Sequence, residues 1–171
     1  MNLDHLNDLP DWDDDDLDRI GEDEEEEGEG WKPNPTREAC KALYKKWNEI
    51  IIMLNGALGA EDDTEEPDDG YKRFMLERKN LVFGDAFEVG AKIRSSEAGS
   101  MYILRMENAA IIRKNAQYIK ISMLGFRAEG LIDETYCKII RDEIDNFRGL
   151  YKEWIATFVK DEFEDEWGLF V

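Results

Sequence analysis

Seven apolar residues follow one another in alternating steps of three and four: Cys137, Ile140, Ile144, Phe147, Tyr151, Trp154 and Phe158. Residues spaced in this way lie on one face of an α-helix. An apolar face of this length needs other apolar surface to cover it in water. The pattern therefore predicts a long amphipathic helix from about 132 to beyond 160, with one face in a core.

Three further segments carry helical patterns. The first has Cys40, Leu43, Trp47, Ile50, Leu54 and Ala57 on one face; Asn34 and Pro35 suit its start, and Gly59 suits its end. The others span about 70–95 and about 100–128. Four long amphipathic helices with short connections favour antiparallel neighbours. The sequence thus predicts an all-α fold, an antiparallel up-down four-helix bundle.

The second and third helices have less regular patterns. On the second, the predicted buried stripe and its flanks are Tyr71, Met75, Val82, Val89 and Ile93 with Phe74, Leu81 and Ala86, and Asp68 or Asp69 suits the N-cap. Gly84 and Gly90 interrupt this helix, so either a neighbouring backbone passes close or the helix bends. Ser96 or Ser100 suits the start of the third helix, which is apolar over much of its circumference.

The charge is distributed unevenly along the chain. The net charge is −19, and residues 1–30 contain fifteen acidic residues and one arginine. Residues 61–69 and 161–166 are also acidic, whereas the remainder carries a net positive charge. Like charges at this density repel and bury nothing, so we expect residues 1–30 to form a disordered acidic tail when unbound. Residues 31–171 then form one bundle domain.

Apolar residues alternate with the acids at both ends of the chain. In the tail, Leu6, Leu9, Trp12 and Leu17 have the acidic–hydrophobic composition of segments that fold onto a partner. Near the C-terminus, Trp167 and Phe170 are similar candidates for partner binding. A solubilising tail with incidental leucines remains an alternative for the first group, and closure of the bundle end for the second.

The composition argues against several kinds of chemistry. His5 is the single histidine, so ferritin-like di-metal centres and histidine-based triads are excluded. Cys40 and Cys137 lie far apart on apolar helix faces and are expected to be buried free thiols. A calcium loop starting at Asp11 lacks the glycine that its sixth position requires. We therefore predict no catalytic residues, no metal site and no cofactor, and we expect a protein that is not an enzyme.

Two polar groups on the helices are candidate binding features. Asn108 and Asn115 occupy core-facing heptad positions, and with Arg78 and Asp85 they are predicted to form a buried polar layer. The layer would fix the helix register or form a small polar ligand pocket. The third helix also carries the cations Arg105, Arg113, Lys114 and Lys120, a candidate anion-binding face. Acids of the last helix, such as Asp142 and Glu143, are the alternative partners of these cations.

These features favour a non-enzymatic interaction protein. We expect the tail to dock on a basic partner or on the basic face of its own bundle. The alternative is a nucleic-acid or phosphate binder in which the tail competes for the basic third helix. Asp4 and Asp8 stand where a secretory signal would need basic and then apolar residues, so we expect a cytoplasmic protein that does not enter the membrane. The oligomeric state stays open.

Overall fold

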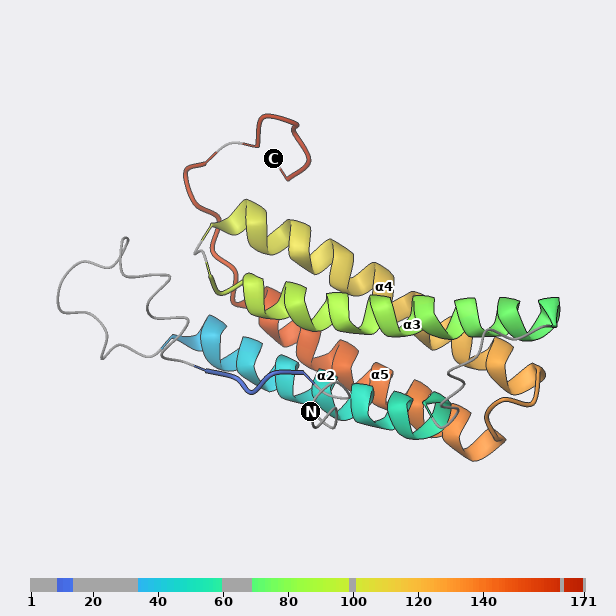
Figure 1. The fold of residues 1–171 in the computed structure, drawn as a ribbon. Helices are drawn as coiled ribbons and strands as arrows, with labels where there is room; N and C mark the ends of the chain where they lie inside the picture. The colour runs from blue at the N-terminus through green and yellow to red at the C-terminus, as the bar shows by residue number, and fades with distance from the viewer. Residues whose placement is uncertain (1–8, 14–33, 60–68, 99–100, 164, 171) are drawn as a thin grey trace.

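Four α-helices make up most of the molecule in the computed structural model (Figure 1): α2 (Pro35–Leu58), α3 (Gly70–Ser95), α4 (Tyr102–Ala128) and α5 (Glu134–Ala156). The structure describes residues 9–13, 34–59, 69–98, 101–163 and 165–170, and none of these lies in a strand. The predicted all-α, four-helix fold is confirmed. The predictions for the remaining residues of the acidic tail, including Leu6 and Leu17, lie outside the described residues.

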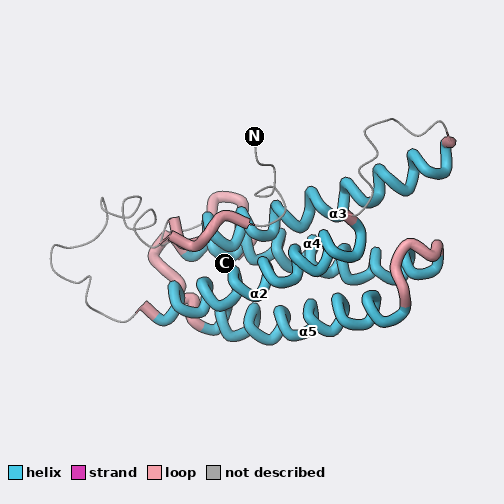
Figure 2. Tube along the Cα trace, turned by 60° about the horizontal axis from the view of Figure 1, so that its bottom comes forward, coloured by secondary structure: helices cyan, strands magenta, loops and turns pink. Residues whose placement is uncertain are grey.

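Each helix packs against two neighbours, so the four form a closed bundle (Figures 1 and 2). α2 contacts α3 and α5, and α4 contacts the same two helices. Contacts between α2 and α3 pair Cys40 with Ile93 and Trp47 with Ala86, so the residue number rises along α2 as it falls along α3. These two helices therefore run antiparallel, and the colours of Figure 1 show the same alternation around the bundle.

The aromatic centre of the core joins α2 and α5. The rings of Trp47 and Phe147 lie 4.6 Å apart between centroids, and Trp47 and Trp154 are fully buried. Phe158 lies beyond α5 and packs edge-on against Trp154 at 4.7 Å. The predicted stripes of α2 and α5 thus form one continuous core. The largest other buried side chains are Leu43, Ile50, Ile51, Leu54, Ile93, Ile112, Ile119, Met123, Phe126 and Ile140.

Side chains just before the helices accept hydrogen bonds from free backbone N–H groups. Asn34 accepts from Arg37, Asp69 from Tyr71, and Asp133 from Tyr136. Such caps stabilise helix starts because the first N–H groups have no partner within the helix. The predictions that Asn34 and Asp69 are N-caps are confirmed. Ser96, however, lies at the end of α3, where its hydroxyl donates to the carbonyl of Lys92 at 2.8 Å.

The start of α4 is capped from a distant part of the chain. Its N-cap residue, Met101, has no side-chain oxygen, and the backbone N–H of Tyr102 donates instead to a carboxylate oxygen of Asp161 at 2.7 Å. An anion at this position also interacts favourably with the helix dipole. Asp161 thereby fixes the segment that follows α5 against the start of α4.

Two expectations about the helices are wrong. α5 ends at Ala156 instead of continuing beyond 160. The backbone N–H groups of Thr157 and Phe158 donate to carbonyls three residues back, and the chain then turns so that Asp161 caps α4. On α3, Tyr71, Phe74 and Leu81 are more than half exposed, although they were expected to lie on or beside the buried stripe. α3 therefore buries a narrower face than its sequence suggests.

Two further sequence expectations concern the cysteines and the membrane. Cys40 and Cys137 are both buried free thiols, as expected. Among the described residues, no helix has the length and apolar character needed to cross a membrane.

Candidate functional site

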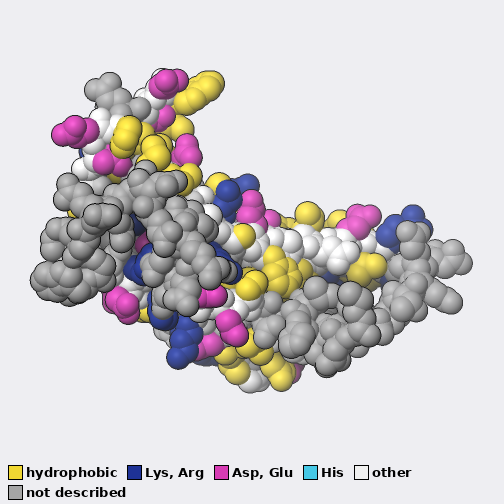
Figure 3. All heavy atoms as spheres, turned by 60° about the vertical axis from the view of Figure 1, so that its left-hand side comes forward, with side chains coloured by type: hydrophobic (Ala, Val, Ile, Leu, Met, Phe, Trp, Pro, Cys, Tyr) yellow, Lys and Arg dark blue, Asp and Glu magenta, His cyan; other side chains and the backbone are white. Residues whose placement is uncertain are grey.

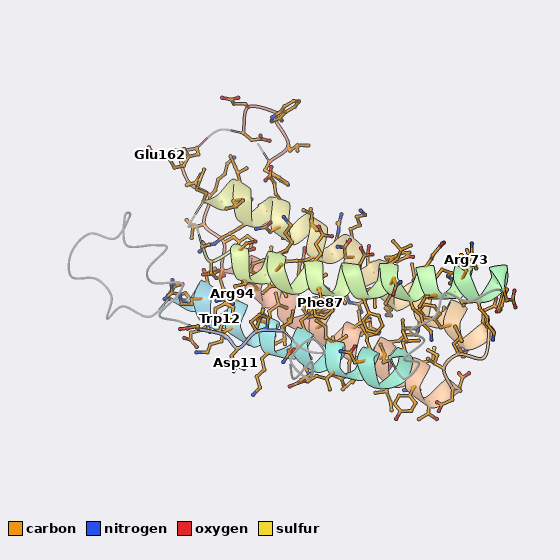
Figure 4. The ribbon with its side chains drawn as sticks, in the orientation of Figure 1. Asp11, Trp12, Arg73, Phe87, Arg94 and Glu162 are labelled. Atoms are coloured by element: carbon orange, nitrogen blue, oxygen red, sulfur yellow. The ribbon has the colours of Figure 1, made fainter. Side chains whose placement is uncertain are left out.

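Residues 9–13 lie along the outside of the bundle where α2 meets α3 (Figure 4). The side chain of Leu9 is only 7% exposed and belongs to the core. Its backbone N–H donates to Oδ1 of Asn48 at 2.9 Å, and the hydroxyl of Tyr44 donates to the carbonyl of Pro10 at 2.7 Å. The ring of Trp12 stands edge-on to Tyr44 at 5.4 Å. We call the surface formed by Tyr44, Asn48, Gly90 and Arg94 the tail groove.

Gly90 makes room for Leu9. A Cβ atom at Gly90 would lie 2.4 Å and 2.6 Å from the two methyl carbons of Leu9. At Gly84, by contrast, no described atom lies within 4 Å of the corresponding position. The close neighbour at Gly90 is thus a leucine side chain from the tail. The sequence predicted a neighbouring backbone or a bend in the helix instead.

Charged groups surround the Tyr44 hydroxyl. Burial raises the pKa of Tyr44, while the charge of Arg94 lowers it and that of Asp11 raises it. Both charges therefore act on the same end of the tail groove. Figure 4 shows Asp11, Trp12 and Arg94 close together there, with Phe87 farther along α3. An acid of the tail and a base of α3 thus accompany the apolar contacts.

A cavity of about 480 Å³ lies at the other end of the α2–α3 pair. The end of α2, the first half of α3 and the α4–α5 connection form its walls. Its apolar lining includes Leu58, Met75, Leu76, Phe83 and Leu131, and Lys72 and Lys79 also line it. Asp69 lines the cavity as well, so apolar walls are combined with two basic side chains and one acidic side chain.

The candidate polar layer is spread along the α3–α4 seam. Asn108 and Asn115 are both buried, and their amide nitrogens donate to Ser95 at 3.3 Å and to Glu88 at 2.6 Å. Glu88, rather than Asp85, is the partner of Asn115. Burial raises the pKa of the half-buried Asp85, and the charge of Glu88 adds to this effect.

Arg78 lies farther along the same seam. Its guanidinium carbon is 5.2 Å from the ring centre of Phe126 and 5.7 Å from that of Phe74. A Cβ atom at Gly125 would lie 2.5 Å from one of its nitrogens, so this glycine leaves space for the guanidinium. The four residues thus form separate contacts along α3 and α4, and the structure does not gather them into one pocket.

The candidate anion-binding face on α4 is partly neutralised. Arg105 pairs with Glu97 at 3.5 Å, and Lys120 pairs with Asp145 of α5. Arg113 and Lys114 are exposed. The acids expected to pair with this helix pair elsewhere: Asp142 with Lys138, and Glu143 with Lys46 at 3.0 Å. The acids of α5 do reach α4, but through Asp145.

The C-terminal candidates lie on a segment that projects from the bundle (Figure 3). Trp167 is 89% exposed and Phe170 is half-buried. The carboxylate of Asp165 accepts hydrogen bonds from the backbone N–H groups of Trp167 and Leu169, and Gly168 has a positive φ of 69°. Trp167 is thus held on a turn and faces solvent, so it does not close the end of the bundle.

A buried carboxylate that the sequence did not reveal connects all four helices. Glu97, in the α3–α4 connection, has a side chain that is only 1% exposed. It pairs with Arg105 of α4 and lies close to Cys40 of α2 and Trp154 of α5. Among the described residues, neither Oε1 of Glu97 nor Nε1 of Trp154 has a hydrogen-bond partner. A single acid in a polar connection gives no sequence signal of burial.

The chemistry available in this buried cluster is limited. Burial raises the pKa of the Cys40 thiol far above its ordinary value, and the charge of Glu97 adds to the increase. A thiol that stays protonated is a poor nucleophile. Among the described residues, no three metal-binding side chains come together either. What the cluster does provide is an ion pair between Glu97 and Arg105, which joins the α3–α4 connection to α4.

Comparison of the chain with protein-family models, curated proteins and solved structures finds no match. The tail groove is the feature in which predicted binding residues meet a defined surface. Of the six candidate partner-binding residues, the structure brings Leu9 and Trp12 onto α2 and α3.

The pH dependence of stability should report the buried Glu97. Burial raises its pKa above the ordinary value of 4.5, although Arg105 and Arg37 act in the opposite direction. The folded state therefore holds the proton more tightly, and stability is lost as the pH rises from 4.5 through the raised pKa. Since glutamine does not ionise, we expect the stability of Glu97→Gln relative to wild type to increase across this window.

Chemical denaturation at a series of pH values measures this difference. Glu162→Gln is the matched control, because Glu162 is exposed. A difference between Glu97→Gln and wild type that stays constant or falls as the pH rises would contradict the account.

Alanine substitutions at the two glycines of α3 should behave differently. Replacing glycine by alanine inside an exposed helix stabilises it by about 0.5–1 kcal/mol, and we expect this gain for Gly84→Ala. Gly90→Ala should gain less or lose stability, because Leu9 must move. Adding Leu9→Ala should restore the gain at position 90. The free energy of unfolding of the variants measures the coupling, and equal gains at both glycines in the wild-type background would contradict the Leu9 contact.

Proposed function

We propose that this protein is a non-enzymatic interaction module whose α2–α3 face binds an extended acidic–hydrophobic peptide segment. Its own residues 9–13 act as the intramolecular ligand, and a partner carrying a similar segment competes with them. The docking of Leu9 and Trp12 in the tail groove is the observation that carries this proposal.

The contacts have the character of peptide recognition. Asn48 and Tyr44 bond to the backbone of Leu9 and Pro10, so these hydrogen bonds would be available to many sequences. The leucine and the tryptophan then supply selectivity through their fit beside Gly90 and Tyr44. A division between backbone hydrogen bonds for affinity and side-chain pockets for specificity recurs in proteins that bind extended peptides.

The energetics favour an exchangeable contact. Burial of one leucine contributes about 1.5–3 kcal/mol, and each net hydrogen bond contributes about 0.5–1.5 kcal/mol. Fixing the backbone of each ordered residue costs about 1–2 kcal/mol. Over five residues the ordering cost, about 5–10 kcal/mol, is larger than the gain from one leucine and two hydrogen bonds, about 2.5–6 kcal/mol. Docking therefore also depends on the contact of Trp12 with Tyr44 and on the covalent connection that keeps the segment near its groove. A partner with more contacts can replace it.

The alternative, anion binding on α4 gated by the tail, has less support. Two of its four cations, Arg105 and Lys120, already pair with acids of the bundle. The described tail residues contact α2 and α3, where they would not cover α4.

A labelled peptide of residues 5–15 tests the proposal on the full chain. In the double variant Leu9→Ala/Trp12→Ala the tail should leave the groove, and the added peptide should bind about tenfold or more tightly than to wild type because it no longer competes with an attached ligand. Fluorescence anisotropy measures the affinity. The matched control is Leu17→Ala/Ile20→Ala, which also removes two apolar tail residues and should bind as wild type does.

A third variant tests where the peptide binds. Adding Asn48→Ala to the double variant removes the acceptor for the Leu9 backbone, and the gain in affinity should shrink. If the double variant binds the peptide no more tightly than wild type, the tail groove is not a peptide site and the proposal fails.

A further inference from the structure

We infer that the tail groove continues along α3 into the 480 Å³ cavity, and that the cavity binds the apolar side chains of the first eight residues of this same chain, Leu6 and Leu3. The inference rests on the proposed function, and it extends the ligand from residues 9–13 to the whole N-terminal segment.

The lining of the cavity and the tail groove share one face of α3. Leu76, Phe83 and Gly90 are seven residues apart, and Lys72, Lys79 and Arg94 lie beside them at steps of three and four. Residues with this spacing form a stripe along a helix. Gly90 contacts Leu9, and Leu76 and Phe83 line the cavity. A single stripe therefore leads from the docked tail to the cavity.

The direction of the docked segment points the preceding residues toward the cavity. Leu9 bonds to Asn48, whereas Pro10 bonds to Tyr44, one turn closer to the start of α2. From Pro10 to Leu9 the described chain therefore runs toward the end of α2. Leu58, at that end, lines the cavity.

The spacing of the tail residues matches the stripe. Leu3, Leu6, Leu9 and Trp12 recur at every third position, which places them on one side of a polyproline II chain, where three residues complete one turn and span about 9.3 Å. Seven residues of α-helix rise about 10.5 Å. With Leu9 at Gly90, a segment in the polyproline II conformation would thus bring Leu6 to Phe83 and Leu3 to Leu76.

The chemistry of the cavity suits this occupant. Leu58, Leu76, Phe83 and Leu131 offer apolar surface to a leucine side chain. Lys72 and Lys79 outnumber Asp69 in the same lining, and they complement the acids Asp4 and Asp8 of the segment. An acidic segment with regularly spaced leucines is therefore preferred over an apolar small molecule or a basic peptide.

A nitroxide spin label placed in the segment tests the inference on the full chain. Asp4→Cys provides the attachment site, because the two native thiols are buried. If the segment occupies the cavity, the NMR methyl signals of Leu76 and Leu58 should lose the most intensity, with a smaller loss at Val89 and none at Ile155, at the far end of α5. The same label at Glu22→Cys should leave the cavity methyls intact.

Two variants of the labelled protein supply the matched comparison. Leu3→Asp/Leu6→Asp should restore the signals of Leu76 and Leu58, because aspartate does not enter an apolar cavity. Ile20→Asp/Gly21→Asp, which adds the same charge to the tail, should leave the signal loss unchanged.

Three results would overturn the inference. The first is a signal loss greatest at Val89 and weak at Leu76, while Leu9 and Trp12 still contact the groove; it would remove the extension but keep the proposed function. The second is loss of the Leu9 and Trp12 contacts as well, which would remove both. The third is signal loss in isotope-labelled protein mixed with unenriched spin-labelled protein, which would assign the cavity to the segment of a second copy.

Discussion

The hydrogen bond from the indole of Trp47 to the carbonyl of Ala86, at 2.7 Å, sets the register of α2 against α3. It is buried, and the same tryptophan packs on Phe147 of α5, so the register of three helices depends on one side chain. Asn48 and Gly90 lie one residue and one turn away from this pair. Their position opposite each other, which defines the tail groove, is therefore a consequence of core packing.

The buried ion pair at one end of the bundle has a related role. Glu97 and Arg105 hold the α3–α4 connection against Cys40 and Trp154. A buried charge pair contributes little net stability because both ions lose their hydration, but breaking it leaves one charge unpaired. The cluster thus ties the end of α3, where Arg94 faces the tail, to the other helices. The residues of the tail groove therefore lie on helices whose positions are set by core packing.

The sequence predicted those parts of the fold that depend on local pattern. The regular stripes of α2 and α5 form the core, and Asn34 and Asp69 cap their helices because capping needs only neighbouring residues. The stripe of α3 was predicted too broadly, since Phe74 and Leu81 are more than half exposed and their exposure depends on how the helices pack together. The end of α5 was predicted too late in the chain. After α5 the chain turns away from the helix axis so that Asp161 caps α4, and this contact joins residues that are distant in sequence.

The candidate site shows the same division. Leu9 and Trp12 stood out as apolar residues among acids, and both contact the bundle. The surface that receives them could not be derived from the sequence, because Asn48 and Gly90 meet only once the register of α2 and α3 is known. The sequence marked Gly90 as an unusual residue within a helix, but it did not reveal the contact with Leu9 that explains it. Glu97 was not recognised at all, because a solvated and a buried glutamate look alike in a polar connection.

Hydrogen exchange at the backbone amide of Leu9 tests the central claim most directly, because this N–H donates to Asn48 only when the segment is docked. In dilute full-length protein the account predicts exchange slower than in a free peptide of residues 5–15. The slowing should not depend on protein concentration and should disappear in Asn48→Ala. Exchange of the Leu9 amide at the rate of the free peptide would contradict the claim.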